Sequence, residues 1–235
     1  MRIEVWSDIA CPFCYIGKRR LEEALAHFPG KTEVEVVYRS FELDSHAPRS
    51  VEYDVHDMLS RKYGMSREHA VANNRNLAAQ ARELGIAFNF DTLKLTNTFD
   101  AHRLSHLAAK QGLMGEMIDQ LYKAYFTDGL LLGDHAVLVQ LAEEVGLARE
   151  EVEAALAGDA FSDAVRSDQQ EAAMFGIRGV PYFILNRKYA VSGAQPVDVF
   201  RQALDQAWRD EHPLTVVGDD GAVCEDGVCT PPEKK

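Results

Sequence analysis

Two of the four cysteines, Cys11 and Cys14, stand at C-x-x-C spacing near the start of the chain. Thiols at this spacing can close a disulfide with each other. In thiol–disulfide exchange one thiolate attacks a substrate disulfide, and a second thiol then releases the mixed disulfide. Two cysteines at this spacing also occur as half of a zinc site, so the surrounding elements must decide between the two chemistries.

The residues around this pair predict a strand followed by a helix. Residues 2–7 are typical of a buried strand. Beyond the cysteines, apolar residues recur on one face of a helix: Leu21, Ala24, Leu25 and Phe28. Pro12 suits the first turn of that helix, and Cys11 then lies at the positive end of the helix dipole, which favours its thiolate. We therefore predict redox chemistry, with Cys11 as the nucleophile and Cys14 as the resolving cysteine.

The rest of the chain predicts a helical middle between two parts of a sheet. A second strand is expected over residues 32–41, and a hairpin over 181–191 with its turn at 186–188. Helices, most of them ending at a glycine, are expected at 67–84, 99–110, 134–145, 150–157, 162–175 and 197–208. This order of elements predicts an α/β fold.

Four sequence blocks carry a resemblance to a known family: residues 7–17, 97–104, 178–183 and 192–195. The chain resembles the thioredoxin superfamily, and its helical middle resembles the DsbA-like group. Most closely it is similar to the FrnE branch, which neighbours the 2-hydroxychromene-2-carboxylate isomerase and kappa-class glutathione transferase families. The resemblance covers residues 1–209 and implies a thioredoxin-like fold with a large inserted all-helical domain.

This resemblance sets the expected domain organisation. Residues 1–43 and 176–209 are expected to form the thioredoxin-like domain. Residues 44–175 are expected to form the inserted helical domain, and 210–235 a flexible acidic tail.

The resemblance also implies roles for residues outside the cysteine pair. Pro181 falls on the cis-proline that faces the C-x-x-C in this superfamily, although its local sequence alone would suggest an ordinary proline at a strand start. The backbone of Val180 would then pair with an extended substrate, and Pro12 and Phe13 would contact it. Phe13 stands where DsbA-type oxidants carry histidine. Because phenylalanine cannot stabilise the Cys11 thiolate, we expect a weaker oxidant than DsbA.

Other polar residues near these blocks leave alternatives open. Asp8 is most simply a strand-end aspartate, but it could also transfer protons or raise the pKa of a nearby thiol as a like charge. His102 and His106 have the spacing of a metal pair, yet no third ligand is evident, so we expect them on a helix surface and predict no metal site. Lys18 is expected in a solvated turn.

The second cysteine pair, Cys224 and Cys229, lies in the tail. Gly227 between them allows a tight turn, so a local disulfide is feasible. We favour an auxiliary redox pair. The alternatives are part of a metal site with Cys11 and Cys14, or thiols without a role.

The composition of the chain argues against some classes of binding partner. The formal net charge is −12, from 25 basic and 37 acidic side chains, which argues against binding to nucleic acid. No apolar run reaches the ~18 residues of a membrane helix. The first residues show no secretory signal pattern, so we expect a cytoplasmic protein, where thiols are kept reduced.

Together these features predict a thiol–disulfide oxidoreductase or protein disulfide isomerase. Its expected partners are disulfide-containing proteins and a cellular thiol reductant, with no nucleic acid and no membrane. We expect no cofactor besides the dithiol, with glutathione or another thiol as a possible co-substrate. Two alternatives stay open: a glutathione-dependent isomerase or transferase of the 2-hydroxychromene-2-carboxylate isomerase type, and a metal-binding thiol protein without turnover.

Overall fold

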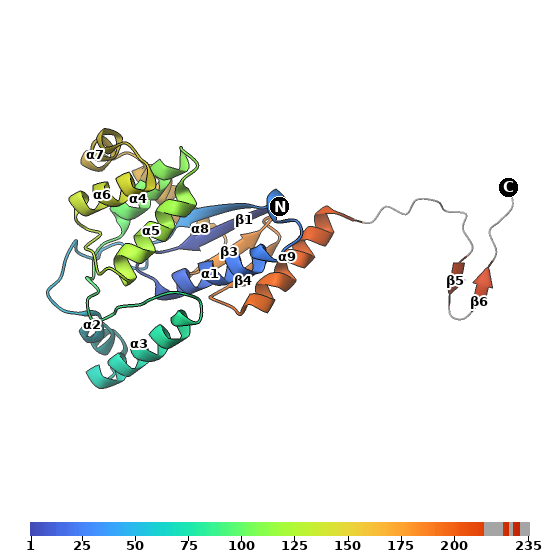
Figure 1. Cartoon of the computed structure of the whole chain (residues 1–235), viewed down its shortest axis with the longest axis horizontal. Coiled ribbons are helices and arrows are strands. Elements are labelled where there is room, and N and C mark those ends of the chain that lie inside the picture. The colour runs from blue at the N-terminus through green and yellow to red at the C-terminus, as the bar shows by residue number, and fades with distance from the viewer. Residues whose placement is uncertain (214–222, 226–227, 231–235) are drawn as a thin grey trace.

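A four-stranded sheet forms the centre of the protein in the computed structural model, which describes residues 1–213, 223–225 and 228–230 (Figure 1). The strand order is β2-β1-β3-β4. The strands are β1 (Arg2–Ser7), β2 (Glu35–Ser40), β3 (Tyr182–Leu185) and β4 (Tyr189–Ser192). Strand β1 is parallel to β2 and antiparallel to β3, and β3 and β4 form the expected hairpin. The α/β, thioredoxin-like prediction is confirmed.

Both faces of the central strand β1 are covered. Because side chains alternate along a strand, Ile3 and Val5 enter the main core, whereas Trp6 enters a second cluster with Ile184. Helices α1 (Pro12–Ala26) and α9 (Val197–Glu211) contact each other, and α9 also packs on β3 and β4. Helix α8 (Ser162–Met174) contacts β2, and the Trp6 indole donates a hydrogen bond to the Asp168 carbonyl of α8 at 2.9 Å.

The remaining helices lie between β2 and α8 in the chain (Figure 1). They are α2 (Val55–Tyr63), α3 (Arg67–Arg82), α4 (Phe99–Ala109), α5 (Met114–Phe126), α6 (His135–Val145) and α7 (Arg149–Ala157). The predicted helical middle is therefore confirmed, although no separate prediction was made for α2 and α5. The predicted insertion, 44–175, includes α8, which packs on the sheet, so the division of the chain into domains stays a prediction.

Two predicted boundaries were wrong by three residues, and the other predicted ends lie within two residues of those in the structure. Strand β2 begins at Glu35 rather than at residue 32, because residues Lys31–Glu33 form a short 3-10 helix. The last helix continues to Glu211, beyond the expected end at 208. Among the described helices, none combines the length and the apolar composition that a membrane crossing requires.

Of the predicted tail, residues 210–211 belong to α9, and two short strands are described further on, β5 (Val223–Glu225) and β6 (Val228–Thr230). They pair antiparallel, and Cys224 and Cys229 occupy opposite positions in the register. The predicted flexibility of 210–235 concerns mainly residues outside the described ranges.

Candidate active site at the start of helix α1

The two N-terminal cysteines lie where β1 leads into α1, as predicted. Cys11 is the N-cap of α1, and Pro12 occupies the start of the helix. The Cys11 N–H donates to the Asp8 carbonyl at 3.1 Å, and the Cys14 N–H donates to the Cys11 carbonyl at 3.0 Å. Cys11 therefore lies at the helix end where unpaired N–H groups favour an anion. Both cysteines are free thiols in the structure.

The loop before β3 lies against Cys11. The Val180–Pro181 peptide bond is cis, as the resemblance implied. The Cys11 thiol donates to the Val180 carbonyl over an Sγ···O distance of 3.7 Å. A Cβ placed on Gly17 would lie 3.0 Å from Pro181 Cγ, so a glycine in α1 allows this close approach. The structure thus brings Cys11, Val180 and Pro181 together, while their roles in catalysis stay predictions.

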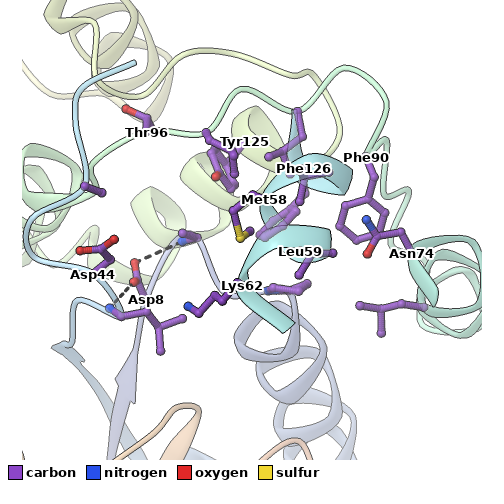
Figure 2. A pocket seen from close by; sticks show the side chains of 18 of the residues that line it. Asp8, Asp44, Met58, Leu59, Lys62, Asn74, Phe90, Thr96, Tyr125 and Phe126 are labelled. Carbon is purple, nitrogen blue, oxygen red and sulfur yellow. Dashed lines mark hydrogen bonds between the residues drawn. The ribbon is translucent and has the colours of Figure 1, made fainter. Parts of the chain in front are cut away.

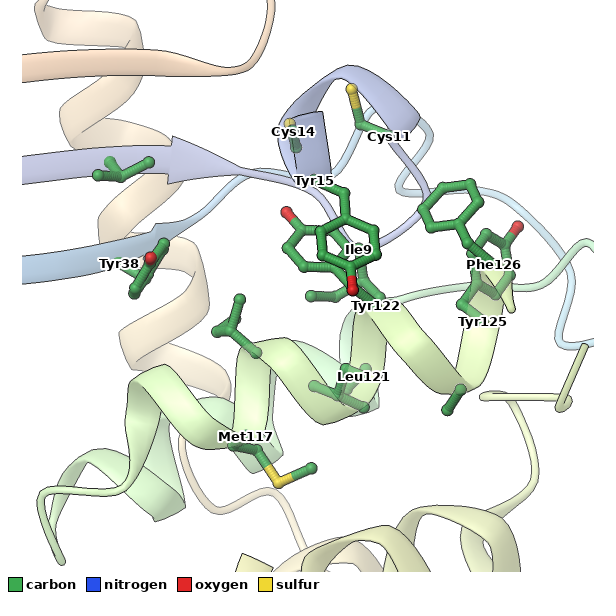
Figure 3. Packing of buried hydrophobic residues seen from close by; sticks show 14 of the residues in the cluster. Ile9, Cys11, Cys14, Tyr15, Tyr38, Met117, Leu121, Tyr122, Tyr125 and Phe126 are labelled. Atoms are coloured by element: carbon green, nitrogen blue, oxygen red, sulfur yellow. The ribbon is translucent and has the colours of Figure 1, made fainter. Parts of the chain in front are cut away.

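Cys14 is buried behind this surface. Figure 3 shows both cysteines beside an aromatic cluster in which Tyr15 stacks on Tyr122, with ring centroids 4.9 Å apart. Burial raises the pKa of the Cys14 thiol well above its usual range, and the neighbouring Cys11 thiol and the Asp8 carboxylate raise it further. The thiol form of Cys14 is therefore strongly favoured in the reduced protein.

Asp8 does follow β1, but the structure makes it a buried charge of the site rather than a plain strand end. Its carboxylate accepts hydrogen bonds from the Leu43 N–H at 2.7 Å, the Thr98 hydroxyl at 2.8 Å and the Ala10 N–H at 3.2 Å. Burial raises the pKa of this carboxyl, but the contact with His102 and these donors outweigh burial and lower it below its usual range. Asp8 is therefore held ionised.

The expectation for His102 was wrong. His102 is buried, and its Nε2 lies 3.4 Å from Asp8 Oδ1, an ion pair when the ring is protonated. His106, one turn further along α4, instead lies 3.1 Å from Asp168 Oδ2 and from Ser40 Oγ. The His102 and His106 rings therefore contact different carboxylates and do not point to a shared metal site. Among the described residues, no group of three or more His, Cys, Asp or Glu side chains could hold a metal ion.

Lys18 also differs from expectation, since it is a buried residue of α1 rather than part of a solvated turn. Its ammonium group pairs with Asp119 of α5 at 2.8 Å and with Glu22 of α1. This ion pair ties the cysteine-bearing helix to the helical segment.

A pocket of about 680 Å³ opens beside the start of α1 (Figure 2). Pro12 and Phe13 line it, as does Asp8. Its other walls come from the loop after β2, from α2 and α3, from the loop before α4, and from the end of α5. This pocket could not be predicted from the sequence, because its walls come from segments far apart in the chain.

The comparisons with known proteins agree with this geometry. The family model of the DSBA-like thioredoxin domain matches residues 2–205. The chain belongs to this family. The matched residues include the cysteine turn, the sheet and the helical segment. The predicted resemblance to the DsbA-like group is therefore confirmed.

Several known proteins are similar to this chain in sequence or in structure. A crystal structure of a probable DsbA oxidoreductase from Streptomyces coelicolor is 48% identical, with a TM-score of 0.87, and covers 99% of this chain and 100% of that one. The uncharacterized protein YwbO of Bacillus subtilis is 31% identical over 206 residues, which is 87% of this chain and 96% of its own length. A structure of 2-hydroxychromene-2-carboxylate isomerase has a TM-score of 0.68 at 14% identity, with 92% and 100% of the chains covered, which shows a shared fold.

The tail cysteines are not placed at this site. The structure describes the backbone of Cys224 and Cys229 in β5 and β6, and their side chains lie outside the described part. Their assignment as an auxiliary redox pair stays a prediction.

Proposed function

We propose that this protein is a thiol–disulfide oxidoreductase that reduces or isomerises disulfides of polypeptides through Cys11 and Cys14. The observation that carries the proposal is the geometry of the pair. Cys11 begins a helix and faces the Val180 carbonyl, and Cys14 is buried behind it as a thiol. The similarity to a probable DsbA oxidoreductase supports the same chemistry.

The proposed reaction has two exchange steps. The Cys11 thiolate attacks one sulfur of the substrate disulfide, which forms a mixed disulfide and releases the other substrate sulfur as a thiolate. The Cys14 thiol loses its proton and attacks Cys11 Sγ, which releases the second substrate thiol. The protein is then oxidised at Cys11–Cys14, and two equivalents of glutathione or another cellular thiol reduce it again. In isomerisation the released substrate thiolate instead attacks the mixed disulfide, with no net oxidation.

Turnover of a protein disulfide tests this proposal directly. We expect the protein to catalyse the reduction of insulin in a buffer of reduced glutathione, with a rate proportional to enzyme concentration. A protein alkylated at both N-terminal cysteines serves as the inactive control. A rate equal to that of this control would refute the proposal.

The order of alkylation tests the roles of the two thiols. We expect a thiol-reactive reagent at pH 6 to modify Cys11 well before Cys14, because the raised pKa of Cys14 keeps it a thiol; both side chains are buried, so burial does not separate them. Peptide mapping by mass spectrometry after short exposures gives the two rates. Faster modification of Cys14 would reverse the assignment.

Phe13 sets an expectation for redox strength. Phe13 is 51% exposed beside the cysteines, and its ring offers no hydrogen bond to a thiolate. A histidine can stabilise the Cys11 thiolate and hence the reduced form. We expect Phe13→His to raise the reduction potential by about 30 mV or more, a tenfold change in equilibrium, and Phe13→Leu to leave it unchanged. A native potential already near the roughly −120 mV of DsbA would contradict this account.

A glutathione-dependent isomerase or transferase of small molecules is the second candidate, and the pocket beside Pro12 and Phe13 favours it. In the isomerases that the sequence resembles, serine usually replaces the first cysteine, whereas this chain carries Cys11. Turnover of a small-molecule glutathione adduct by Cys14→Ser, with no reduction of insulin by the native protein, would establish this candidate instead.

A further inference from the structure

The His102 ring of α4 lies next to the buried Asp8 carboxylate. His102 is 2% exposed, and its Nε2 lies 3.4 Å from Asp8 Oδ1. Within the described part of the chain this is the only ion-pair contact of the ring, and Nε2 has no hydrogen-bond partner. A buried polar atom without a hydrogen bond requires an explanation, and the neighbouring charge of Asp8 supplies one.

The Asp8 carboxylate requires a positive charge nearby. Its hydrogen-bond donors, on Leu43, Thr98 and Ala10, hold it ionised but are neutral groups (Figure 2). A buried ion without an opposite charge is strongly destabilising. Among the described residues, His102 is the only basic group within ion-pair distance of Asp8. A protonated His102 ring therefore supplies the counter-charge.

The other titratable groups around α4 are neutral or paired elsewhere. On α5, burial raises the pKa of the Tyr122 and Tyr125 phenols, so both stay neutral. The remaining groups have their own partners: Asp100 pairs with Arg103 and with His135 of α6, His106 pairs with Asp168 of α8, and Arg103 also donates to the Ala155 carbonyl of α7. The charge of His102 therefore acts mainly on Asp8.

Asp8 in turn acts on the resolving cysteine, since its carboxylate raises the pKa of Cys14 as a like charge. In resolution the Cys14 thiol ionises and its sulfur attacks Cys11 Sγ. The bond between Cys11 and the substrate breaks, and the departing substrate sulfur takes up a proton in place of the one that Cys14 lost. A positive charge beside Asp8 weakens the repulsion and so favours the Cys14 thiolate.

We propose that His102 is a positioning residue for resolution: its protonated ring compensates the charge of Asp8 and so allows the Cys14 thiol to ionise. This inference rests on the proposed function and deepens it. Because His102 belongs to α4, the helical segment then takes part in the chemistry of the cysteine pair.

The protonation of His102 can be measured in the reduced native protein by the nitrogen chemical shifts of its ring, assigned from the backbone. We expect a doubly protonated ring at pH 7, and a neutral ring in Asp8→Asn, where the compensated charge is gone. A neutral His102 ring in the native protein at pH 7 overturns the proposal. This measurement decides even if a substitution of His102 prevents folding.

The rates of the two exchange steps test the effect of this charge. One equivalent of dithiobis(nitrobenzoate) reacts with the reduced protein in two phases: attack by Cys11 releases the first thionitrobenzoate, and resolution by Cys14 releases the second. All proteins compared carry Cys224→Ser and Cys229→Ser, so that the released chromophore reports the N-terminal pair alone.

We expect His102→Gln to slow the second phase about three- to tenfold at pH 7 and to move its pH profile to higher pH. The three donors to Asp8 remain in this variant, so the carboxylate stays ionised while its counter-charge is lost. A first phase that stays fast shows that the variant is folded. His106→Gln is the matched control, because His106 lies one turn further along α4 and pairs with Asp168 instead; it should leave both phases unchanged.

A double substitution shows whether His102 acts through Asp8. In the Asp8→Asn background, His102→Gln should move the pH profile little, whereas a purely structural role would give the same shift in both backgrounds and overturn the proposal. A second phase of His102→Gln with the native profile, or one moved to lower pH, also overturns it and leaves the oxidoreductase proposal standing. A native protein that lacks the second phase at every pH refutes the proposed function itself.

Discussion

Cys11→Ser is expected to lower the turnover of protein disulfides by at least about 10³-fold, the largest effect of any single substitution in this protein. A serine hydroxyl does not ionise near neutral pH and is a poor nucleophile toward sulfur, so the first exchange step is lost. The measurement is insulin reduction in glutathione buffer. Thermal unfolding of the variant should match that of the native protein, because serine retains the size of the N-cap side chain.

Cys14→Ser provides the complementary result. Cys11 keeps its place at the N-terminus of α1, so the first step continues, while the mixed disulfide can no longer be resolved from within the protein. We expect a covalent complex with substrate that is visible on non-reducing gels and absent from Cys11→Ser. Trapping by Cys11→Ser and not by Cys14→Ser would exchange the roles of the two cysteines.

The features predicted from sequence are those encoded by neighbouring residues. The strand of residues 2–7, the proline after Cys11 and the apolar face beyond it together specify where the cysteines lie relative to the helix. The β3–β4 hairpin follows in the same way from two short β-rich segments around a turn. The cis bond at Pro181 was implied by the family resemblance alone, since its local sequence suits an ordinary strand start.

The features missed depend on contacts between distant residues. Asp8 looked like a strand end because its partners, Leu43, Thr98 and His102, lie far along the chain. Helix α5 is an exception, because it carries an ordinary apolar stripe that includes Met117, Leu121 and Tyr125, and the sequence pattern was sufficient to predict it. The pocket, to which the end of α5 contributes, depends instead on segments far apart in the chain.

Asp8→Asn is expected to destabilise the protein by about 3–5 kcal/mol near neutral pH, because it removes a buried charge from its partner His102 and from its donors. The amide also turns an N–H group toward a backbone N–H. Asp44→Asn is the matched control, since Asp44 lines the same pocket but is exposed. Urea unfolding of the three proteins measures the difference.

The difference in unfolding free energy between the native protein and Asp8→Asn should depend on pH. The pKa of Asp8 is lowered in the folded protein, so its ionised form stabilises the fold above the ordinary aspartate pKa of about 3.9. The contribution is lost as the pH falls through the lower folded pKa. The gap between native protein and Asp8→Asn should therefore be largest near neutral pH and narrow below about pH 4. A gap that does not depend on pH would show that the substitution acts through packing rather than charge.

Asp8→Asn also tests how the Asp8 carboxylate affects the reactivity of the Cys14 thiol. The other titratable groups near Asp8 are His102 of α4 and two phenols of α5: that of Tyr125, and that of Tyr122, which donates to the Asp8 carbonyl at 3.4 Å. Burial raises the pKa of both phenols, so they stay neutral in the working range. The charge of Asp8 raises the pKa of Cys14, and removing it should move the pH profile of mixed-disulfide resolution to lower pH.

A role for Asp8 as the proton acceptor of Cys14 predicts the opposite: resolution in Asp8→Asn would slow at every pH. The geometry favours the electrostatic role, because three donors already use the carboxylate oxygens and the lowered pKa makes Asp8 a weak base. Stopped-flow rates of resolution, measured from pH 5 to 9, distinguish the two.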